Sequence, residues 1–288
     1  MLTTDQYKFP VSVIIATLGG DSLRETIEQL NCGALVPTEI LVCIPEEDAF
    51  RVEHLSYPNV RVIKTNCRGQ VAQRAIGFKL ALHTMILQLD DDILLNKDAL
   101  QELTEELQRL GRGNALAPLY YNAATGRCLH ELIGGVAGWL RSLWACFICG
   151  APWGLKRMGV VTKVGLNYGV DSSNCGIKPF ETQWLPGGCV LCYCEDVIRE
   201  IFFPYAGKAY GEDLIHSFLR TKRGVRHWVI PTAKCITTVA EPPISRASIE
   251  AENNARRYYV KISGGVEWRL SLYNFIYELK RHLQRIKC

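Results

Sequence analysis

Short apolar runs alternate with longer amphipathic segments through the first 110 residues. Residues 11–16 form an apolar, β-branched run, which is typical of a strand buried on both faces of a sheet. The same pattern predicts three further strands, at 39–44, 60–64 and 84–89. Helical periodicity and capping residues predict helices at about 21–30, 69–82 and 99–110. Strands that alternate with helices predict the α/β class, with a mostly parallel central sheet flanked by helices.

Polar side chains follow three of these predicted strands. Thr17 ends the first, Glu46 comes just after the second, and Asp90, Asp91 and Asp92 end the fourth. Because ligands bind at the carboxyl ends of strands in open α/β sheets, we expect these residues to converge. Adjacent carboxylates repel one another, and a divalent cation such as Mn²⁺ or Mg²⁺ relieves that repulsion. The alternative is a solvated acidic turn that caps the next helix.

The periodicity loosens beyond residue 115. Residues 133–151 are apolar, and the segment is about as long as a bilayer span. Arg141 lies near its middle, however, and three glycines precede Trp139. This composition favours an interfacial or buried hairpin over a membrane-spanning helix. Residues 182–194 predict a turn and a strand, and 225–230 predict a last short strand before a boundary at Pro242-Pro243.

A second acidic pair, Glu212-Asp213, opens a predicted helix over residues 209–220. Acidic side chains at a helix N-terminus are stabilised by the helix dipole, which is a sufficient structural reason for both residues. A carboxylate in that position is also able to act as a general base that takes a proton from an attacking hydroxyl. The residues alone leave both interpretations open.

The C-terminal segment, residues 246–288, predicts a basic amphipathic helix. From residue 256 to the end there are eight Lys or Arg and two acidic residues, a net charge of +6, so the rest of the +4 chain carries −2. Such a helix suits a membrane surface or another anionic partner, and the alternatives are ordinary packing or a homodimer contact. A general nucleic-acid binder is not favoured, because its basic residues usually spread over a working face. The oligomeric state is left open.

The composition of the 288 residues, 48% apolar and 22% charged, excludes wholesale disorder. The first apolar run is short and follows no basic segment, so we expect no signal peptide and a cytoplasmic protein, with the cytosolic face of a membrane as a further possibility. The twelve cysteines then predict reduced, mostly buried thiols, and zinc binding by Cys189, Cys192 and Cys194 is the lesser alternative.

Five segments, in this order, resemble the motifs of the inverting family 2 glycosyltransferases with the GT-A fold: PVSVIIAT, GQVAQRAIGF, LQLDDDIL, WLPGGCVL and YGEDLIHSFLRTKRG. The resemblance covers about residues 9–245, apart from an apolar insertion at about 126–172. It implies a single GT-A-like catalytic domain over residues 1–245, followed by a helical basic extension over 246–288.

The resemblance also implies the role of each matching residue. It assigns Asp213 as the catalytic base, with Glu212 orienting the acceptor, and Asp92 as a metal ligand supported by Asp90. Substrate binding is implied for residues on the nucleotide, phosphate or acceptor side of the family pattern, namely Thr17, Arg74, Asp90, Asp91, Trp184, Gly187 and Gly188. Glu46 is a further substrate-binding candidate, although it stands just after the positions, Ile44 and Pro45, at which the family often has two aspartates. Arg257 is a candidate for holding the leaving diphosphate, because arginine suits phosphate, and a solvated or lipid-facing helix is its alternative role.

The implied function is the metal-dependent, inverting transfer of a sugar from a nucleotide-sugar, with UDP-sugar favoured. The expected acceptor is a hydroxyl group of a lipid-linked or cell-surface glycan precursor. Residues 254–258 match the processive Gln-x-x-Arg-Trp motif poorly, so we expect one sugar to be added at a time. The alternatives are a nucleotidyltransferase that makes an activated sugar, and a nucleotide-sugar-binding module without turnover.

Overall fold

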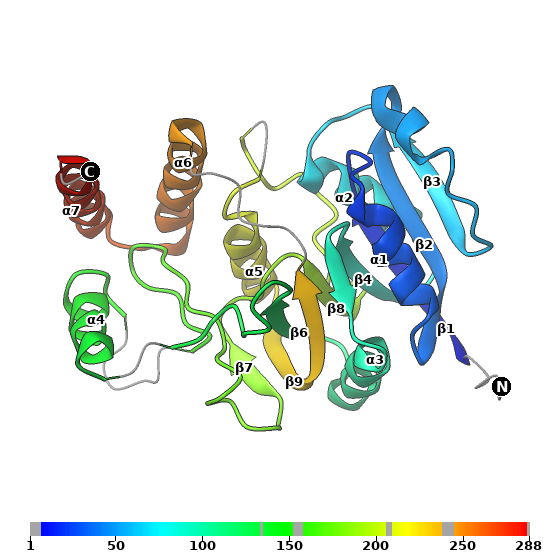
Figure 1. Ribbon diagram of the computed structural model, residues 1–288, viewed down its shortest axis with the longest axis horizontal. Helices are drawn as coiled ribbons and strands as arrows, with labels where there is room; N and C mark the ends of the chain where they lie inside the picture. The colour runs from blue at the N-terminus through cyan, green and yellow to red at the C-terminus, as the bar shows by residue number, and fades with distance from the viewer. Residues whose placement is uncertain (1–6, 133–134, 152–157, 206–208, 238–244, 287–288) are drawn as a thin grey trace.

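The computed structural model describes residues 7–132, 135–151, 158–205, 209–237 and 245–286. Its centre is a nine-stranded mixed sheet in the order β3-β2-β1-β4-β8-β6-β9-β5, with β7 paired to β9 (Figure 1). The first half of this sheet is parallel and consists of β1 (Tyr7–Ala16), β2 (Leu35–Pro45), β3 (Val60–Thr65) and β4 (Met85–Asp90). All four of these strands contain the apolar runs that predicted them.

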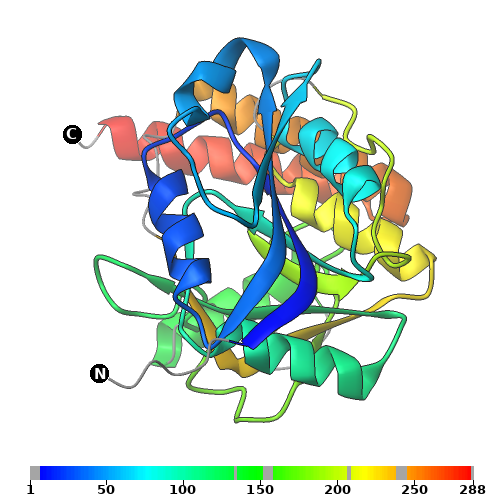
Figure 2. The same cartoon turned by 90° about the vertical axis from the view of Figure 1, so that its right-hand side faces the viewer.

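The helices of this half lie on both faces of the sheet. Side chains of α1 (Ser22–Asn31) and α3 (Ala99–Leu110) pack with Val13 and Ile15 of β1 in one cluster, whereas α2 (Gln70–Leu80) packs with Ile14 in another. Figure 2 shows α1 and α2 on opposite sides of β1 and β2. This arrangement explains why β1 is apolar at successive positions and confirms the predicted α/β class.

The packing of α2 depends on a glycine. A Cβ atom at Gly77 would lie 2.4 Å from Cγ2 of Ile14 and 2.8 Å from Sγ of Cys43, so only glycine lets the helix approach β1 and β2 this closely. The 3-10 helix Glu46–Val52 connects β2 to the loop before β3. Each connection returns the chain to the start of the next strand, and the carboxyl ends of β1, β2 and β4 meet at one edge.

The second half of the sheet is mixed and contains strands that the sequence pattern missed. It comprises β5 (Ile93–Leu95), β6 (Asn114–Asn122), β7 (Phe180–Thr182), β8 (Cys189–Tyr193) and β9 (Arg226–Thr237). The β8 strand lies antiparallel between β4 and β6, and β6 runs parallel to β9. The expected strand 225–230 was too short, because β9 continues past Pro231 along β6 and pairs with β5.

In the described part of the C-terminal half the helices are α4 (Gly135–Phe147), α5 (Glu212–Lys222), α6 (Arg246–Ser263) and α7 (Glu267–Ile286). The prediction of a hairpin within 133–151 is wrong, because residues 135–147 form one continuous helix. The inner face of α4 packs on α7, with the rings of Trp144 and Tyr273 6.5 Å apart. The predicted boundary at Pro242-Pro243 lies outside the described residues.

The C-terminal extension is two helices rather than one, and glycines make the break. Gly264 has a φ of 71°, and a Cβ atom at Gly265 would lie 2.6 Å from the carbonyl oxygen of Lys163. No helix in the described part of the chain is long and apolar enough to cross a membrane.

Candidate functional site

The turn after β1 is tied to the acidic turn after β4. The hydroxyl of Thr17 donates a hydrogen bond to Oδ2 of Asp91 and accepts one from the backbone N–H of Gly19 at 2.9 Å. Thr26 donates to the carbonyl oxygen of Asp91 at 2.9 Å. Burial raises the pKa of Asp91, although the Thr17 hydrogen bond opposes that change. Asp91 therefore helps to hold the two strand ends together, while its side chain borders a cavity.

That cavity, with a volume of about 490 Å³, lies over the carboxyl ends of the parallel strands. Thr17, Asp91 and residues at the start of α2 line it, and we call it the donor cavity; its full lining is Ala16, Thr17, Leu18, Gly20, Arg68, Gly69, Gln70, Gln73, Asp91 and Ala209. Gln73 is buried and donates to the carbonyl oxygens of Thr17 and Cys43, at 2.8 and 2.7 Å. The ends of β1 and β2 and the start of α2 thus form one rigid wall.

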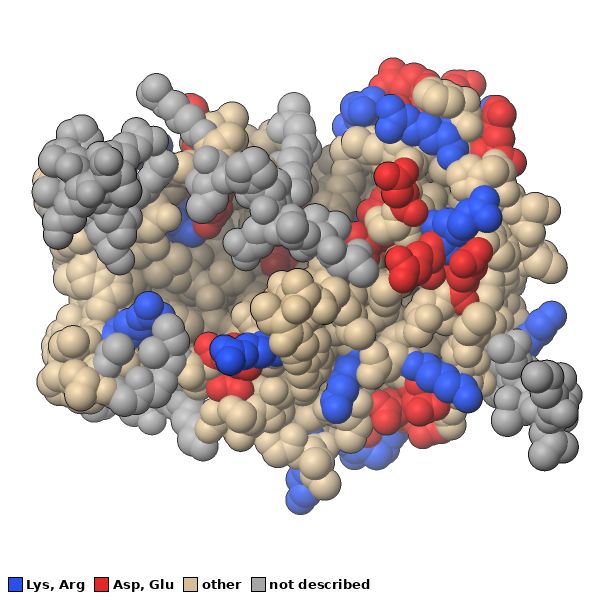
Figure 3. All heavy atoms as spheres, in the orientation of Figure 1, with Lys and Arg blue, Asp and Glu red and all other residues tan. Residues whose placement is uncertain are grey.

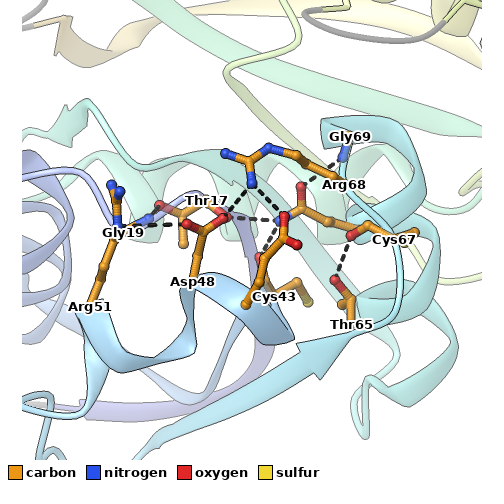
Figure 4. A network of polar contacts seen from close by, with 11 residues as sticks. Thr17, Gly19, Cys43, Asp48, Arg51, Thr65, Cys67, Arg68 and Gly69 are labelled. Carbon is orange, nitrogen blue, oxygen red and sulfur yellow. Dashed lines mark hydrogen bonds and ion pairs between the residues drawn. The ribbon is translucent and has the colours of Figure 1, made fainter.

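The acidic residues after β2 differ in their surroundings. Glu46 is exposed on the 3-10 helix and lines neither this cavity nor the one described next. Asp48 is buried and accepts from Nη1 of Arg68 at 2.9 Å, while Glu47 accepts from the same nitrogen at 2.6 Å (Figure 4). Sequence reasoning missed Arg68, Gln70, Gln73 and Asp48, although Gln70 and Gln73 stand within the quoted helix motif.

A second cavity, of about 460 Å³, contains the two acidic clusters predicted from the sequence, and we call it the catalytic cavity. Asp90 and Asp92 line it from the end of β4, and Glu212 and Asp213 line it from the start of α5. Gln70 and Ala209 line both cavities, so the two adjoin. The remaining predicted residues that line it are Trp184, Gly187 and Gly188.

Arg74 joins the two acidic clusters. Its guanidinium is buried; Nη1 donates to Oε1 of Glu212 at 2.5 Å and Nη2 donates to Oδ1 of Asp90. Gln70 donates to the same oxygen of Asp90 at 2.8 Å. Burial lowers the pKa of Arg74, but the charges of Asp90 and Glu212 outweigh that effect and raise it. Arg74 is therefore a positive charge held between two carboxylates, beneath the cavity rather than in its lining.

The α5 N-terminus presents Glu212 and Asp213 to the catalytic cavity. Gly211 precedes them with a φ of 67°, a conformation that favours glycine. The Oε2 atom of Glu212 is buried and has no hydrogen-bond partner among the residues that the structure describes. Burial, together with the charge of Glu212, raises the pKa of Asp213 to about 7. A carboxyl group with that pKa changes its protonation near neutral pH, as a general base requires.

Two glycines shape the opposite wall. A Cβ atom at Gly187 would lie 2.8 Å from Oε1 of Glu212 and 3.3 Å from Cβ of Asp213. A Cβ atom at Gly188 would lie 3.2 Å from Oδ2 of Asp90. The glycine pair therefore preserves the space in front of both acidic clusters.

The chemistry of the lining suits a divalent metal ion. Asp90 and Asp92 present carboxylate oxygens to the same cavity, and Gly188 leaves room beside Oδ2 of Asp90. Mg²⁺ and related ions bind through one or two carboxylates and complete their coordination with water and substrate phosphates. Within the described ranges, no three His, Cys, Asp or Glu side chains form a metal-binding group. The donor set thus fits an ion shared with a phosphate-bearing substrate.

The insertion at 126–172 supplies the remaining wall of the catalytic cavity, through Leu129, His130 and Asn167. Trp184 is buried in that wall, where its Nε1–H donates to the carbonyl oxygen of Tyr168 at 2.9 Å and its ring meets His130 edge-on at 5.9 Å. Burial lowers the pKa of His130, which favours the neutral ring. The insertion carries no motif, so no sequence pattern indicated these residues.

Arg257 does not join the other predicted residues. It lines a separate cavity of about 350 Å³ beside α6 and the start of α7, together with Tyr258, Lys261 and Glu267. Its neighbour Arg256 pairs with Glu252 and lies over the ring of Tyr273, 5.6 Å from its centre. The expected contact of Arg257 with a leaving diphosphate stays a prediction.

Residues 12–135 match the model of the family described as Glycosyl transferase family 2. GalNAc-T7, solved with UDP, GalNAc and Mn²⁺, is similar in structure over 88% of this chain and 48% of its own, with a TM-score of 0.61 and 17% identity. TarS 1–349 of S. aureus is similar over 87% of this chain and 64% of its own, with a TM-score of 0.51 and 16% identity. This chain therefore spans about half to two thirds of those structures. No curated protein matches it in sequence.

Proposed function

We propose that this chain, whose residues 12–135 match the family 2 glycosyltransferase model and whose fold is similar to that of two glycosyltransferase structures, transfers one sugar at a time from a nucleotide-sugar to a hydroxyl group. The transfer proceeds by a single displacement that inverts the anomeric carbon and is assisted by a divalent metal ion. The acceptor is a lipid-linked or cell-surface glycan precursor, met at the cytosolic face of a membrane.

One observation carries the proposal: four carboxylates from two distant parts of the chain line one cavity, which adjoins a second cavity at the ends of the parallel strands. The donor cavity receives the nucleotide, with UDP favoured, and GalNAc-T7 offers a precedent because it was solved with UDP. The sugar then lies at the junction of the two cavities, beside Gln70. Its anomeric carbon faces Glu212 and Asp213.

Asp90 and Asp92 are the residues that hold the metal ion, either Mn²⁺ or Mg²⁺. When bound with the diphosphate, the ion neutralises the negative charge that develops on the leaving group. Arg74 keeps Asp90 in place from below by its hydrogen bond to Oδ1. Oδ2, beside Gly188, stays on the side of the cavity.

The acceptor side works through Glu212 and Asp213. The unpartnered Oε2 of Glu212 accepts a hydrogen bond from the acceptor sugar, which orients the attacking hydroxyl. Asp213 takes the proton of that hydroxyl as its oxygen bonds to the anomeric carbon. The bond from that carbon to the diphosphate oxygen breaks in the same step, and its electron pair leaves with the diphosphate. The opposite-face attack inverts the configuration without a protein nucleophile.

A panel of nucleotide-sugars, each with and without Mn²⁺, tests the donor by the thermal stability of the purified protein. A ligand that binds only the native state raises the melting temperature by mass action. We expect a UDP-sugar to raise it only with Mn²⁺, and Asp92→Asn to abolish the increase. Asp98→Asn serves as the matched control, because Asp98 is exposed at the start of α3 and lines neither cavity.

Transfer itself is followed by the release of nucleoside diphosphate in the presence of acceptor extracts. Asp213→Asn should keep the metal-dependent thermal increase and lose transfer by at least about 10³-fold, since general-base catalysis and positioning are both affected. Full transfer activity in both Asp92→Asn and Asp213→Asn would overturn the site assignment. Binding without turnover in the wild-type protein would instead favour a binding module.

A further inference from the structure

The outer face of α4 is apolar and largely exposed to solvent. Val136, Trp139 and Phe147 are 76%, 60% and 65% exposed, and Leu140 is exposed beside them. These positions fall at helical spacing, so their side chains form one stripe along the helix. Ala145 is buried on the opposite face of α4, while Trp144 lies at the edge of the stripe and packs against Tyr273 of α7.

Helix α7 carries a second exposed apolar stripe. Trp268 and Phe275 are each 64% exposed, and Leu279 is exposed one turn further on. Positions 268, 275 and 279 again follow helical spacing, while Leu270 and Tyr273 face the core they share with α4. Figure 1 shows α4 and α7 together at the end of the molecule that is remote from β3. We call the two exposed stripes the apolar end face.

The charge distribution separates this end from the opposite one. In Figure 3, Lys, Arg, Asp and Glu crowd the upper right, near the 3-10 helix and β3, whereas the described surface over α4 is mostly uncharged. The only charged residue within α4 is Arg141, which is exposed. The segment from residue 256 to the C-terminus has a net charge of +6. Apolar stripes with positive charge beside them match an anionic lipid surface.

We propose that the apolar end face docks the protein on an anionic lipid bilayer, with α4 and α7 lying in the interface. The large exposed aromatic side chains enter the acyl boundary, while Arg141 and the basic segment contact lipid phosphates. A second copy of the chain is a poorer occupant, because two such faces would bring two +6 segments together.

Docking also bears on the acceptor. The insertion at 126–172 contains α4 and supplies Leu129, His130 and Asn167 to the catalytic cavity. In this proposal α4 faces the bilayer, while other residues of the same insertion line the acceptor side of the catalytic cavity. This consequence, that the acceptor is carried by a membrane lipid, rests on the proposed function, whereas the docking itself does not.

The test is sedimentation of the full-length protein with vesicles, in the absence of any nucleotide-sugar. Vesicles of phosphatidylcholine mixed with phosphatidylglycerol should bind the protein, and binding should weaken with added salt. Neutral phosphatidylcholine vesicles should bind it less. Phe147→Ser should reduce the vesicle partition coefficient about tenfold, and Trp139→Ser in addition should reduce it further, because each change removes a large apolar side chain from the interface.

Phe50→Ser is the matched control, since Phe50 is a phenylalanine of nearly equal exposure, 64%, on the distant 3-10 helix. It should leave vesicle binding unchanged, and melting temperatures should show that all variants fold. The proposal is overturned if the wild-type protein does not sediment with anionic vesicles, or if Phe50→Ser weakens vesicle binding as much as Phe147→Ser does. If the wild-type protein is a dimer and Phe147→Ser makes it monomeric, the apolar end face is instead the contact between two copies of the chain. Vesicle binding without any transfer activity would overturn the proposed function and leave the docking intact.

Discussion

The donor cavity and the catalytic cavity share an edge but are built from different chemistry. The donor cavity has a wall in which Gln73 ties two strand ends together by neutral hydrogen bonds, and the one carboxylate in its lining, Asp91, accepts from Thr17. The ion pairs of Arg68 lie at its rim, where Arg68 is exposed. The catalytic cavity has four carboxylates in its lining, and Arg74 is bound to two of them. The donor cavity therefore depends mainly on hydrogen bonds that fix its shape, whereas the catalytic cavity concentrates negative charge.

This difference predicts how much stability each region loses when one of its interactions is removed. A wall of neutral hydrogen bonds tolerates small changes, because each net bond contributes only about 0.5–1.5 kcal/mol. Buried carboxylates cost solvation energy unless a positive charge or a proton compensates each one. Arg74 compensates Asp90 and Glu212 in part, a proton compensates Asp213 below pH of about 7, and a metal ion fits beside Asp92.

Arg74→Ala makes the strongest test of that contrast. It should lower the free energy of unfolding by about 3–5 kcal/mol, because it leaves the buried Glu212 and the partly buried Asp90 without their counter-charge. Urea denaturation measures the change. Arg68→Ala is the matched control, since Arg68 also pairs with two carboxylates but is itself exposed, and its loss of stability should be clearly smaller than that of Arg74→Ala. Equal losses in the two variants would contradict the contrast.

Gly187→Ala tests the space in front of Glu212. The added Cβ atom would lie 2.8 Å from Oε1, so the carboxylate must shift, and kcat/KM for transfer should fall about 10²-fold. Gly20→Ala makes the same change at the donor cavity, where the nearest atom, Oδ2 of Asp91, is 3.7 Å away. That control should lose little activity. If the two variants behave alike while keeping the wild-type melting temperature, the close approach at Gly187 is not what positions Glu212.

The pH dependence of transfer tests the role of Asp213. With a pKa of about 7, the carboxyl group is protonated below that pH and is then unable to accept a proton from the acceptor. The value of kcat/KM should therefore fall about tenfold for each pH unit below about 7 and level off above it. A rate that stays constant from about pH 5 to pH 8 would exclude Asp213 as the base, provided that donor binding is also constant over that range.

The stability of Asp213→Asn gives the smallest expected effect, and its sign is specific. The folded pKa of Asp213, about 7, lies above the ordinary value of 3.8, so folding favours the protonated form. That contribution to the free energy of unfolding is lost as the pH rises through about 7. Asparagine stays neutral, so the variant should exceed the wild-type stability at about pH 8 by on the order of 1 kcal/mol, because the partly exposed side chain is screened by water.

At about pH 5 the advantage of Asp213→Asn should be smaller than at pH 8. The exposed Asp98→Asn provides the control, and its stability difference from the wild type should be nearly the same at both pH values. Urea denaturation at the two values is sufficient. An Asp213→Asn protein that is less stable than the wild type at the higher pH would show that the carboxylate is well compensated in the folded state.

Short-range patterns were sufficient for the first half of the molecule. The four strands β1–β4 and the helices α1–α3 appeared where periodicity predicted them, since a strand buried on both faces and an amphipathic helix each leave a local signature. Because ligands bind at the carboxyl ends of the strands in such sheets, Thr17 and the acidic turn were expected at one edge, and the structure places them there. The acid pair at 212–213 and the glycines at 187–188 were identified by the motif resemblance.

The second half shows where local patterns end. The β6 strand is buried at its first seven positions, but nothing in the sequence places β8 between it and β4. The helix α4 was mistaken for part of a hairpin, because its glycines suggested a turn whereas packing of Trp144 against Tyr273 stabilises a helix. Residues of the insertion that wall the catalytic cavity have no motif at all.

The sequence by itself determined the α/β class, the parallel strands of the donor half, and the residue types that carry the proposed chemistry. Only the tertiary structure decided that Arg74 binds Glu212, which is 138 positions further along the chain, and that Glu46 stays outside both cavities. The physical reason is the distance along the chain over which each signal acts. Periodicity and capping act over a few neighbouring residues, whereas a buried ion pair forms only where the folded sheet brings two distant strand and helix ends within hydrogen-bond distance.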